Sequence, residues 1–192
     1  MNLDDFEVGY NIPAKIGMKI QDIQTPALII DYDIFQDNIN KMKNFVNNNK
    51  VKLRPHAKMH KSVDVAKHQI NIGGAHGICC QKVSEAEVFA RNGIQDILIT
   101  NQVTNLKKIE RLTKIPFWGT KIGCCIDNLQ NVLDIQNSAA INNTLINILV
   151  ESPLFASSFM ETRLLPINLT ICQLPGFSGS GRNMADIICA EP

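Results

Sequence analysis

The stretch of the sequence with the most evident chemistry is RPHAKMHK, residues 54–61, in which three cationic side chains and two histidines stand close together. A lysine amine attacks an aldehyde only when part of it is unprotonated. Positive charge from Arg54 and Lys61, together with partial burial, disfavours the ammonium form of Lys58 at the centre of the stretch. The motif therefore predicts a reactive amine at Lys58.

The two histidines of this stretch, His56 and His60, have two open interpretations. Either imidazole could carry protons and add positive charge beside Lys58, or both could pack and hydrogen-bond around it as supports. Their H-x-x-x-H spacing is that of zinc-binding helices, but it spans a predicted strand end and lacks the glutamate of H-E-x-x-H. We therefore expect no metal site at these histidines.

Length and composition narrow the class of protein. A chain of 192 residues with a net charge of +1 and 45% hydrophobic residues suits one globular domain with a buried core. Near-zero charge provides no long-range field to gather nucleic acid or an anionic membrane, so a small molecule is the expected partner. The N-terminus, MNLDDFEVGY, lacks the order of a signal peptide, and no apolar run reaches the roughly 18 residues that cross a bilayer. We expect a soluble, cytoplasmic protein.

Four of the six cysteines form adjacent pairs, Cys79–Cys80 and Cys124–Cys125, inside apolar runs. Neither pair has the C-x-x-C spacing of a zinc or redox site. The pattern predicts buried, reduced thiols.

The elements that must position the motif alternate between strand and helix. Short apolar runs typical of buried strands lie at residues 27–31, 51–56, 77–83, 96–100, 121–127 and 145–151. Segments with helical periodicity lie between them, and Asp33 is expected to cap the first. Ser84–Glu87 has the S-x-x-E form of a capping box. This alternation predicts an α/β fold with a parallel sheet covered on both sides.

The carboxyl ends of parallel strands meet at one edge, where such folds carry their chemistry. The polar residues at these ends form the predicted ring His56–Lys58, Gln81–Lys82, Thr100–Asn101, Asp127–Asn128 and Glu151. Asp127 has the alternative role of a strand-end cap, and Lys82 with Glu85 could form a structural ion pair.

Three stretches carry a resemblance: TPALIIDYDIFQDNINKM, RPHAKMHKSVDVAKHQI and GICCQKVSEAEVFARNGIQDILITNQV. They resemble the N-terminal half of the pyridoxal-phosphate enzymes related to D-threonine aldolase and eukaryotic-type D-serine dehydratase, and HAKMHKSVDV is similar to the 3-hydroxy-D-aspartate aldolases among them. The resemblance covers about residues 8–151 and implies a (β/α)8 barrel of the alanine-racemase type. In that fold, residues 27–31 would belong to the region of a second, mostly β domain, and the first barrel strand would end at Lys58.

The resemblance also implies a cofactor and roles for individual residues. Lys58 matches the lysine that forms the Schiff base with pyridoxal 5′-phosphate. Gln81 and Asn101 match positions that line the cofactor site, and Arg54, His56 and His60 would lie around it. Full-length relatives also use a divalent metal near their distal end, but its ligands cannot be assigned in this sequence.

The implied reaction is the cleavage of a 3-hydroxy-D-amino acid to glycine and an aldehyde such as glyoxylate, by a carbon–carbon lyase. Dehydration of D-serine to pyruvate and ammonia is an alternative within the same group. A second alternative is a single-domain barrel that carries the cofactor without catalysis. Relatives often pair as homodimers, so a homodimer is possible here.

The resemblance ends near residue 151, where the composition changes to proline, serine and glycine without clear periodicity. A complete barrel takes about 250 residues, and five barrel strands are legible here. We therefore expect an N-terminal extension at residues 1–24, a partial cofactor-binding barrel at 25–151 and a divergent tail at 152–192, with the whole chain a truncated form of the enzyme.

Overall fold

The computed structural model describes residues 6–150, 167–170 and 188–189. The chain forms two compact units, Met1–Asn38 and Ile39–Pro192. The first contains an isolated bridge between Val8 and Ile12, the 3-10 helix Ile20–Asp22 and the start of helix α1, Tyr32–Asn49.

Residues 27–31 do not form the strand that their apolar run predicts. Leu28 and Ile29 are 103% and 53% exposed, and among the described residues no strand pairs with this segment. Backbone groups in a strand need a hydrogen-bonding neighbour, so an apolar run without one remains irregular.

Helix α1 begins earlier than its sequence pattern indicates, because Asp31 and not Asp33 holds its first turn. The Ile34 backbone N–H donates to Asp31 Oδ1 at 3.0 Å. Asp33 itself lies in the first turn of the helix, where its negative charge interacts favourably with the positive, amino end of the helix dipole.

The second unit is built on a parallel sheet with the strand order β2-β3-β4-β5-β6. These strands are Ile78–Cys80 (β2), Asp96–Ile99 (β3), Lys121–Ile126 (β4), Ile146–Val150 (β5) and Ile167–Thr170 (β6). All neighbouring pairs are parallel, so their carboxyl ends meet at one edge. The predicted parallel α/β arrangement is confirmed.

Strand β6 lies in the segment that sequence analysis left without assigned structure. Its residues pair with β5 from Ile146 opposite Ile167 to Leu149 opposite Thr170. The signal for it was the alternation of apolar and polar residues in INLT, which is typical of a strand but too short to be decisive.

The run at 51–56 was predicted as a full strand, but only Lys52–Leu53 (β1) is one, paired antiparallel with Ile188–Cys189 (β7). The run joins the parallel sheet through a single bridge, His56 to Cys79. Pro55 lies between the two contacts and has no N–H to donate, which limits the ladder that this segment can form.

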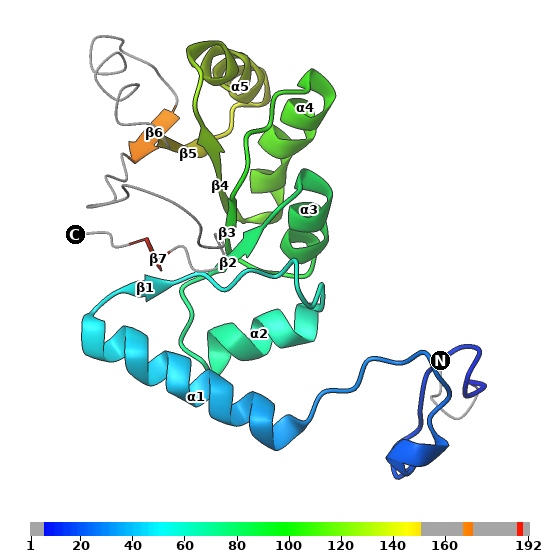
Figure 1. The fold of residues 1–192 in the computed structure, drawn as a ribbon. Coiled ribbons are helices and arrows are strands. Elements are labelled where there is room, and N and C mark those ends of the chain that lie inside the picture. Colours follow the sequence, from blue (N-terminus) through cyan, green and yellow to red (C-terminus); the bar gives the residue numbers. More distant parts are fainter. Residues whose placement is uncertain (1–5, 151–166, 171–187, 190–192) are drawn as a thin grey trace. The chain divides into compact units, whose positions relative to one another are not determined.

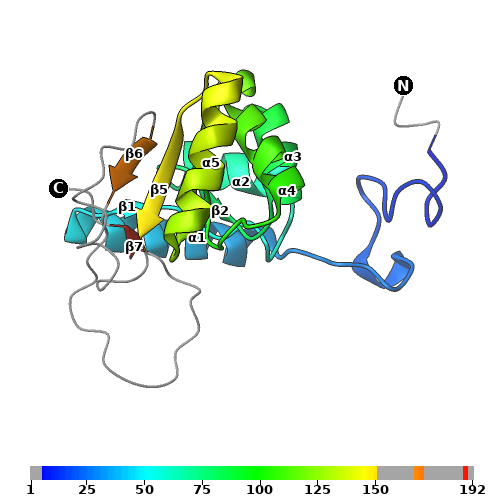
Figure 2. The same ribbon diagram turned by 90° about the horizontal axis from the view of Figure 1, so that it is seen from above.

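Helices follow the strands. They are Val63–Asn71 (α2), Val83–Arg91 (α3), Leu106–Lys114 (α4) and Leu129–Asn142 (α5), with the 3-10 turn Ile115–Trp118 after α4. Helices α3, α4 and α5 lie on the same side of the sheet (Figure 1). The same arrangement is visible from above (Figure 2). Helix α2 begins after its cap Ser62, and Gly74 follows its end at a φ of 69°.

The start of α3 differs from the predicted capping box. The helix already begins at Val83, its N-cap is Lys82, and no side chain caps it. Glu87, the last member of the predicted box, is buried and binds the Arg111 guanidinium of α4 instead. The S-x-x-E pattern therefore marked the helix but not its first residue.

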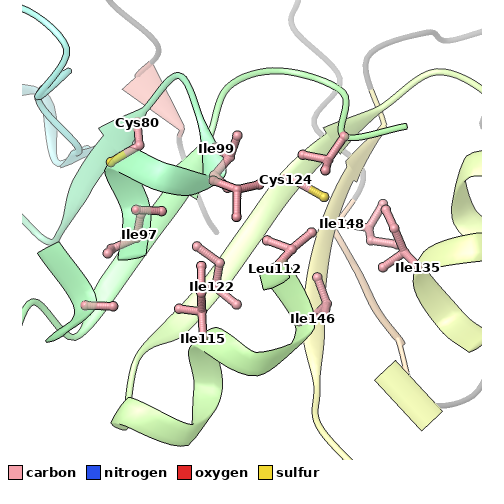
Figure 3. Close-up of a cluster of buried hydrophobic side chains, with 14 of the residues drawn as sticks. Cys80, Ile97, Ile99, Leu112, Ile115, Ile122, Cys124, Ile135, Ile146 and Ile148 are labelled. Atoms are coloured by element: carbon pink, nitrogen blue, oxygen red, sulfur yellow. The ribbon is translucent and has the colours of Figure 1, made fainter. Parts of the chain in front are cut away.

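The main core lies between the sheet and these helices. Isoleucines on alternate strand positions face Leu112, Ile115 and Ile135 from the helical layer (Figure 3). The strand residues at its centre are fully buried: Ile97, Ile99, Ile122, Ile146 and Ile148. Burying one such side chain stabilises the fold by about 1.5–3 kcal/mol, so this layer fixes the positions of the strand ends.

The opposite face of the sheet carries a smaller cluster of Cys79 and Leu98, with Leu149 packed against it. Cys80 and Cys124 point into the main core. All four cysteines of the two pairs are buried, reduced thiols, as predicted. Burial raises the pKa of the Cys124 thiol to about 12, and it raises that of Cys80 further, so both thiols are unreactive in the native chain.

In the part of the chain that the structure describes, no helix has the length and apolar character needed to cross a membrane.

Candidate active site

The segment that carries Lys58 leaves the sheet directly after His56. Up to that point it pairs with β2: the Cys79 N–H donates to the Pro55 carbonyl and the Ala57 N–H to the Cys79 carbonyl, each at 2.8 Å. In a parallel ladder the next bond would run from the Gln81 N–H to the Ala57 carbonyl. That carbonyl instead accepts the Lys61 N–H at 2.8 Å, which closes a turn over residues 57–61.

The backbone groups of Gln81 that this turn leaves unpaired are both taken by side chains. The Gln81 N–H donates to Glu85 Oε2 at 2.9 Å, and the Asn101 amide donates to the Gln81 carbonyl at 3.0 Å. The ladder between the first segment and β2 therefore ends here, because the Ala57 carbonyl and both backbone groups of Gln81 have other partners.

Lys58 stands inside this turn and is partly buried. Its backbone N–H donates to Nδ1 of His56, two residues before it, at 3.3 Å. Lys61 closes the turn at a φ of 51°, in the left-handed region that only a few residue types adopt readily. The amine of Lys58 is therefore carried by a backbone with little freedom to move.

His56 reaches from this turn to β3. Its Nε2 lies 3.1 Å from Thr100 Oγ1, and the Thr100 hydroxyl donates to the Cys80 carbonyl at 3.4 Å. The structure thus brings together His56, Thr100 and the end of β2, as the predicted ring requires.

On the other side of Lys58, His60 repeats the Nδ1 contact of His56 but not its Nε2 contact, because Nε2 of His60 is buried without a hydrogen-bond partner in the described part of the chain. The Ser62 backbone N–H donates to His60 Nδ1 at 3.0 Å. Ser62 is in turn the N-cap of α2, and its hydroxyl accepts the Val65 N–H at 3.3 Å. The second histidine therefore ties the turn to the following helix.

Both imidazoles are neutral at neutral pH. Burial lowers the pKa of His56 from its usual value of 6.5; the charge of Lys58 lowers it further, and Glu85 opposes the shift. Burial likewise lowers the pKa of His60, against the effect of the Gln69 side chain. The lowered pKa values disfavour the positive charge that one of the two interpretations gives these histidines, and the interpretation as supports fits the structure better than that as proton carriers.

Arg54 was predicted to lie around the cofactor site with Lys58, but its side chain binds at the amino end of the strands, opposite the end that carries Lys58. Its Nε donates to Asp96 Oδ1 at 2.5 Å and its Nη2 to Oδ2 at 3.3 Å, at the amino end of β3. His76 Nε2 lies 3.5 Å from the same carboxylate. Gly77 leaves room for it, because a Cβ there would lie 2.6 Å from Asp96 Oδ1. The charge of Arg54 is therefore matched by Asp96 and does not act on Lys58.

The remaining members of the predicted ring are spread along the same edge. Asn128, and not Asp127, caps the next helix, since its Oδ1 accepts the Gln130 N–H at 2.8 Å. Lys82 is exposed at the start of α3. Glu151 lies outside the described residues.

Two partners were not predicted from the sequence, one at each end of the strands. Glu85 was read as an ion-pair partner but accepts a backbone N–H, and Asp96 was not selected at all. The pairing of Asp96 with Arg54 depends on which residues of neighbouring strands stand opposite each other, which one sequence does not state. The Glu85 contact is local, to the backbone four residues earlier, and depends on where α3 begins.

The comparisons with known proteins agree with this architecture. The model of the family described as alanine racemase, N-terminal domain, matches residues 30–152. The 3-hydroxy-D-aspartate aldolase of Paracoccus denitrificans (strain Pd 1222) is 49% identical over 146 residues, which cover 76% of this chain and 38% of that protein. The chain thus spans well under half the length of this curated relative.

Two solved structures share the fold. The D-threonine aldolase from Filomicrobium marinum has a TM-score of 0.69 and 39% identity, covering 71% of this chain and 36% of that one. The D-threo-3-hydroxyaspartate dehydratase from Delftia sp. HT23 has a TM-score of 0.62 and 29% identity, covering 67% and 34%. These matches confirm the expected alanine-racemase-type α/β fold.

Proposed function

Since this chain belongs to the alanine racemase N-terminal domain family, we propose that it binds pyridoxal phosphate through Lys58 and contributes this lysine to a carbon–carbon lyase. The lyase cleaves a 3-hydroxy-D-amino acid to glycine and an aldehyde such as glyoxylate. Residues 25–151 form the part that binds the cofactor.

The observation that carries this proposal is the position of Lys58 in the fold. It lies in a closed turn at the end of the first segment of a parallel sheet, which is the edge where such folds carry their chemistry. The similarity of the chain to an aldolase at 49% identity supports the choice of reaction.

The residues around Lys58 fit a pyridoxal cofactor by their chemistry. The primary amine of Lys58 can form the covalent bond to the cofactor aldehyde. The side chains of Gln81, Thr100 and Asn101 are neutral and polar, so they can form hydrogen bonds but cannot react with the aldehyde as an amine does. The bound cofactor supplies an electron sink for the bond that breaks next to the amino group.

Dehydration is the second candidate reaction. The similarity to D-threo-3-hydroxyaspartate dehydratase, at 29% identity, favours it over other chemistries of the fold. Under this alternative the chain would remove water and then ammonia from a 3-hydroxy-D-amino acid, for example D-serine with release of pyruvate, and would leave the carbon–carbon bond intact.

Product analysis with the full 192-residue chain and added pyridoxal phosphate separates these possibilities. An aldolase releases glyoxylate and glycine from 3-hydroxy-D-aspartate, a dehydratase releases pyruvate from D-serine, and a cofactor carrier leaves both substrates intact. Lys58→Arg is expected to lower glyoxylate release at least about 100-fold, whereas Lys67→Arg, an exposed lysine of α2, changes it less than about twofold. Equal loss in both variants, or no glyoxylate from the unaltered chain, contradicts the proposal.

A further inference from the structure

The same hydrogen-bonding pattern occurs before and after Lys58 in the chain. His56 Nδ1 accepts the N–H of Lys58, and His60 Nδ1 accepts the N–H of Ser62, so each imidazole binds the backbone two residues after it. The turn over 57–61 lies between these two contacts.

These contacts decide where each imidazole proton lies. A backbone N–H can only donate, so Nδ1 of His56 must be the unprotonated ring nitrogen. Nε2 then carries the proton and donates to Thr100 Oγ1 at 3.1 Å. The Thr100 hydroxyl has one proton of its own, which goes to the Cys80 carbonyl because that oxygen can only accept.

The direction of every bond from Lys58 to β2 is therefore fixed. The chain runs from the Lys58 N–H through the imidazole of His56 and the Thr100 hydroxyl to the Cys80 carbonyl. A second proton on His56 would turn Nδ1 into a donor facing another donor and would break the first link. The same argument assigns the proton of His60 to its Nε2.

We propose that His56 and His60 are backbone clamps: positioning residues that hold the turn of Lys58 through their Nδ1 atoms, with the proton of each on Nε2. His56 ties the front of the turn to β2 and β3, and His60 ties its end to the cap of α2. This inference rests on the proposed function in so far as the Lys58 amine is the reactive group. The clamps leave that amine free while fixing the backbone that aims it.

The tautomers are measurable without any cofactor. A long-range ¹H–¹⁵N spectrum of the full chain contains only four imidazoles, and comparison with His56→Asn and His60→Asn assigns the two of interest. The expected result is a protonated Nε2 and an unprotonated Nδ1 on both. A proton on Nδ1 of His56, or a doubly protonated ring at neutral pH, overturns the proposal.

Rescue by a conservative variant separates a clamp from mere packing. The Asn side-chain oxygen can take the place of Nδ1, whereas Leu offers no acceptor. In His56→Leu, exchange of the Lys58 amide should become about tenfold faster and capture of pyridoxal phosphate at Lys58 about tenfold slower, and both rates should stay within about threefold in His56→Asn. His68→Asn, on α2, serves as the control and should change neither rate.

The results distinguish a failed clamp from a failed function. Correct tautomers in a chain that takes up no cofactor at Lys58 support the clamps and refute the proposed function. Cofactor capture that is equally slow in the Asn and Leu variants refutes the clamps and leaves the proposed function standing.

Discussion

Replacing Arg54 with Met is expected to lower the free energy of unfolding by about 2–4 kcal/mol. The lost contacts are two charge-assisted hydrogen bonds to Asp96, at 2.5 and 3.3 Å, between side chains that are only 10% and 12% exposed. Breaking a fully buried pair costs about 3–5 kcal/mol. The lower range applies here because His76, 3.5 Å from Asp96, remains as a partial partner.

A double-mutant cycle isolates the pair. Urea unfolding of the full chain is followed by circular dichroism for Arg54→Met, Asp96→Asn and the double variant, and the coupling free energy is expected at about 1–3 kcal/mol. Lys107→Met, an exposed cation of α4, is the control and should change stability by less than about 0.5 kcal/mol. A coupling below about 0.5 kcal/mol would refute the reasoning that this pair fixes the segment before Lys58 to β3.

Acid is expected to lower the free energy of unfolding as the pH falls below about 6.5. In the native chain the pKa values of His56 and His60 are lowered, so in this range the unfolded chain binds protons at these imidazoles more readily than the native chain does. Urea titrations across this range check it; a stability that rises toward acid would be inconsistent with the shifts. Gly77→Ala should cost about 1–3 kcal/mol, since its Cβ would meet the backbone carbonyl oxygen of Asp96 as well as Oδ1 of its side chain; unchanged denaturant midpoints would show that the backbone of β3 shifts to make room. Cys124, with a pKa raised to about 12, should react with iodoacetamide only when the chain unfolds. Prompt labelling in the native state would argue against its burial.

The alternation of strands and helices was predictable because the apolar periodicity changes clearly along residues 62–150. Strands β2 to β5 and helices α2 to α5 occur where the pattern indicates them. A continuous apolar run such as KIGCCID has few alternatives to a buried strand. Residues 27–31 have the same character but no neighbouring strand among the described residues, so the pattern alone was insufficient there.

Helix starts were predicted less well, because several adjacent polar residues compete for the same cap. Asp31 and Asp33 both precede the apolar face of α1, and only the hydrogen bond to Ile34 shows which one caps it. Ser84 offered a better cap than Lys82 on propensity, yet the helix begins before it because Val83 is already buried.

The candidate site was predictable in its residues but not in its charges. The position of Lys58 beside two histidines follows from the motif, whereas the pairing of Arg54 with Asp96 depends on the register between the first segment and β3. The neutral state of the histidines depends on burial, which the sequence of the motif does not reveal.

The most direct test of the account is to trap the cofactor on the chain. The full protein is incubated with pyridoxal phosphate, reduced with borohydride and digested, and the labelled lysine is identified by mass spectrometry. The account predicts that the reduced cofactor is found on Lys58 and that Lys58→Arg abolishes the label. Label scattered over many lysines, or none at all, would contradict the claim that this turn presents a cofactor-binding amine.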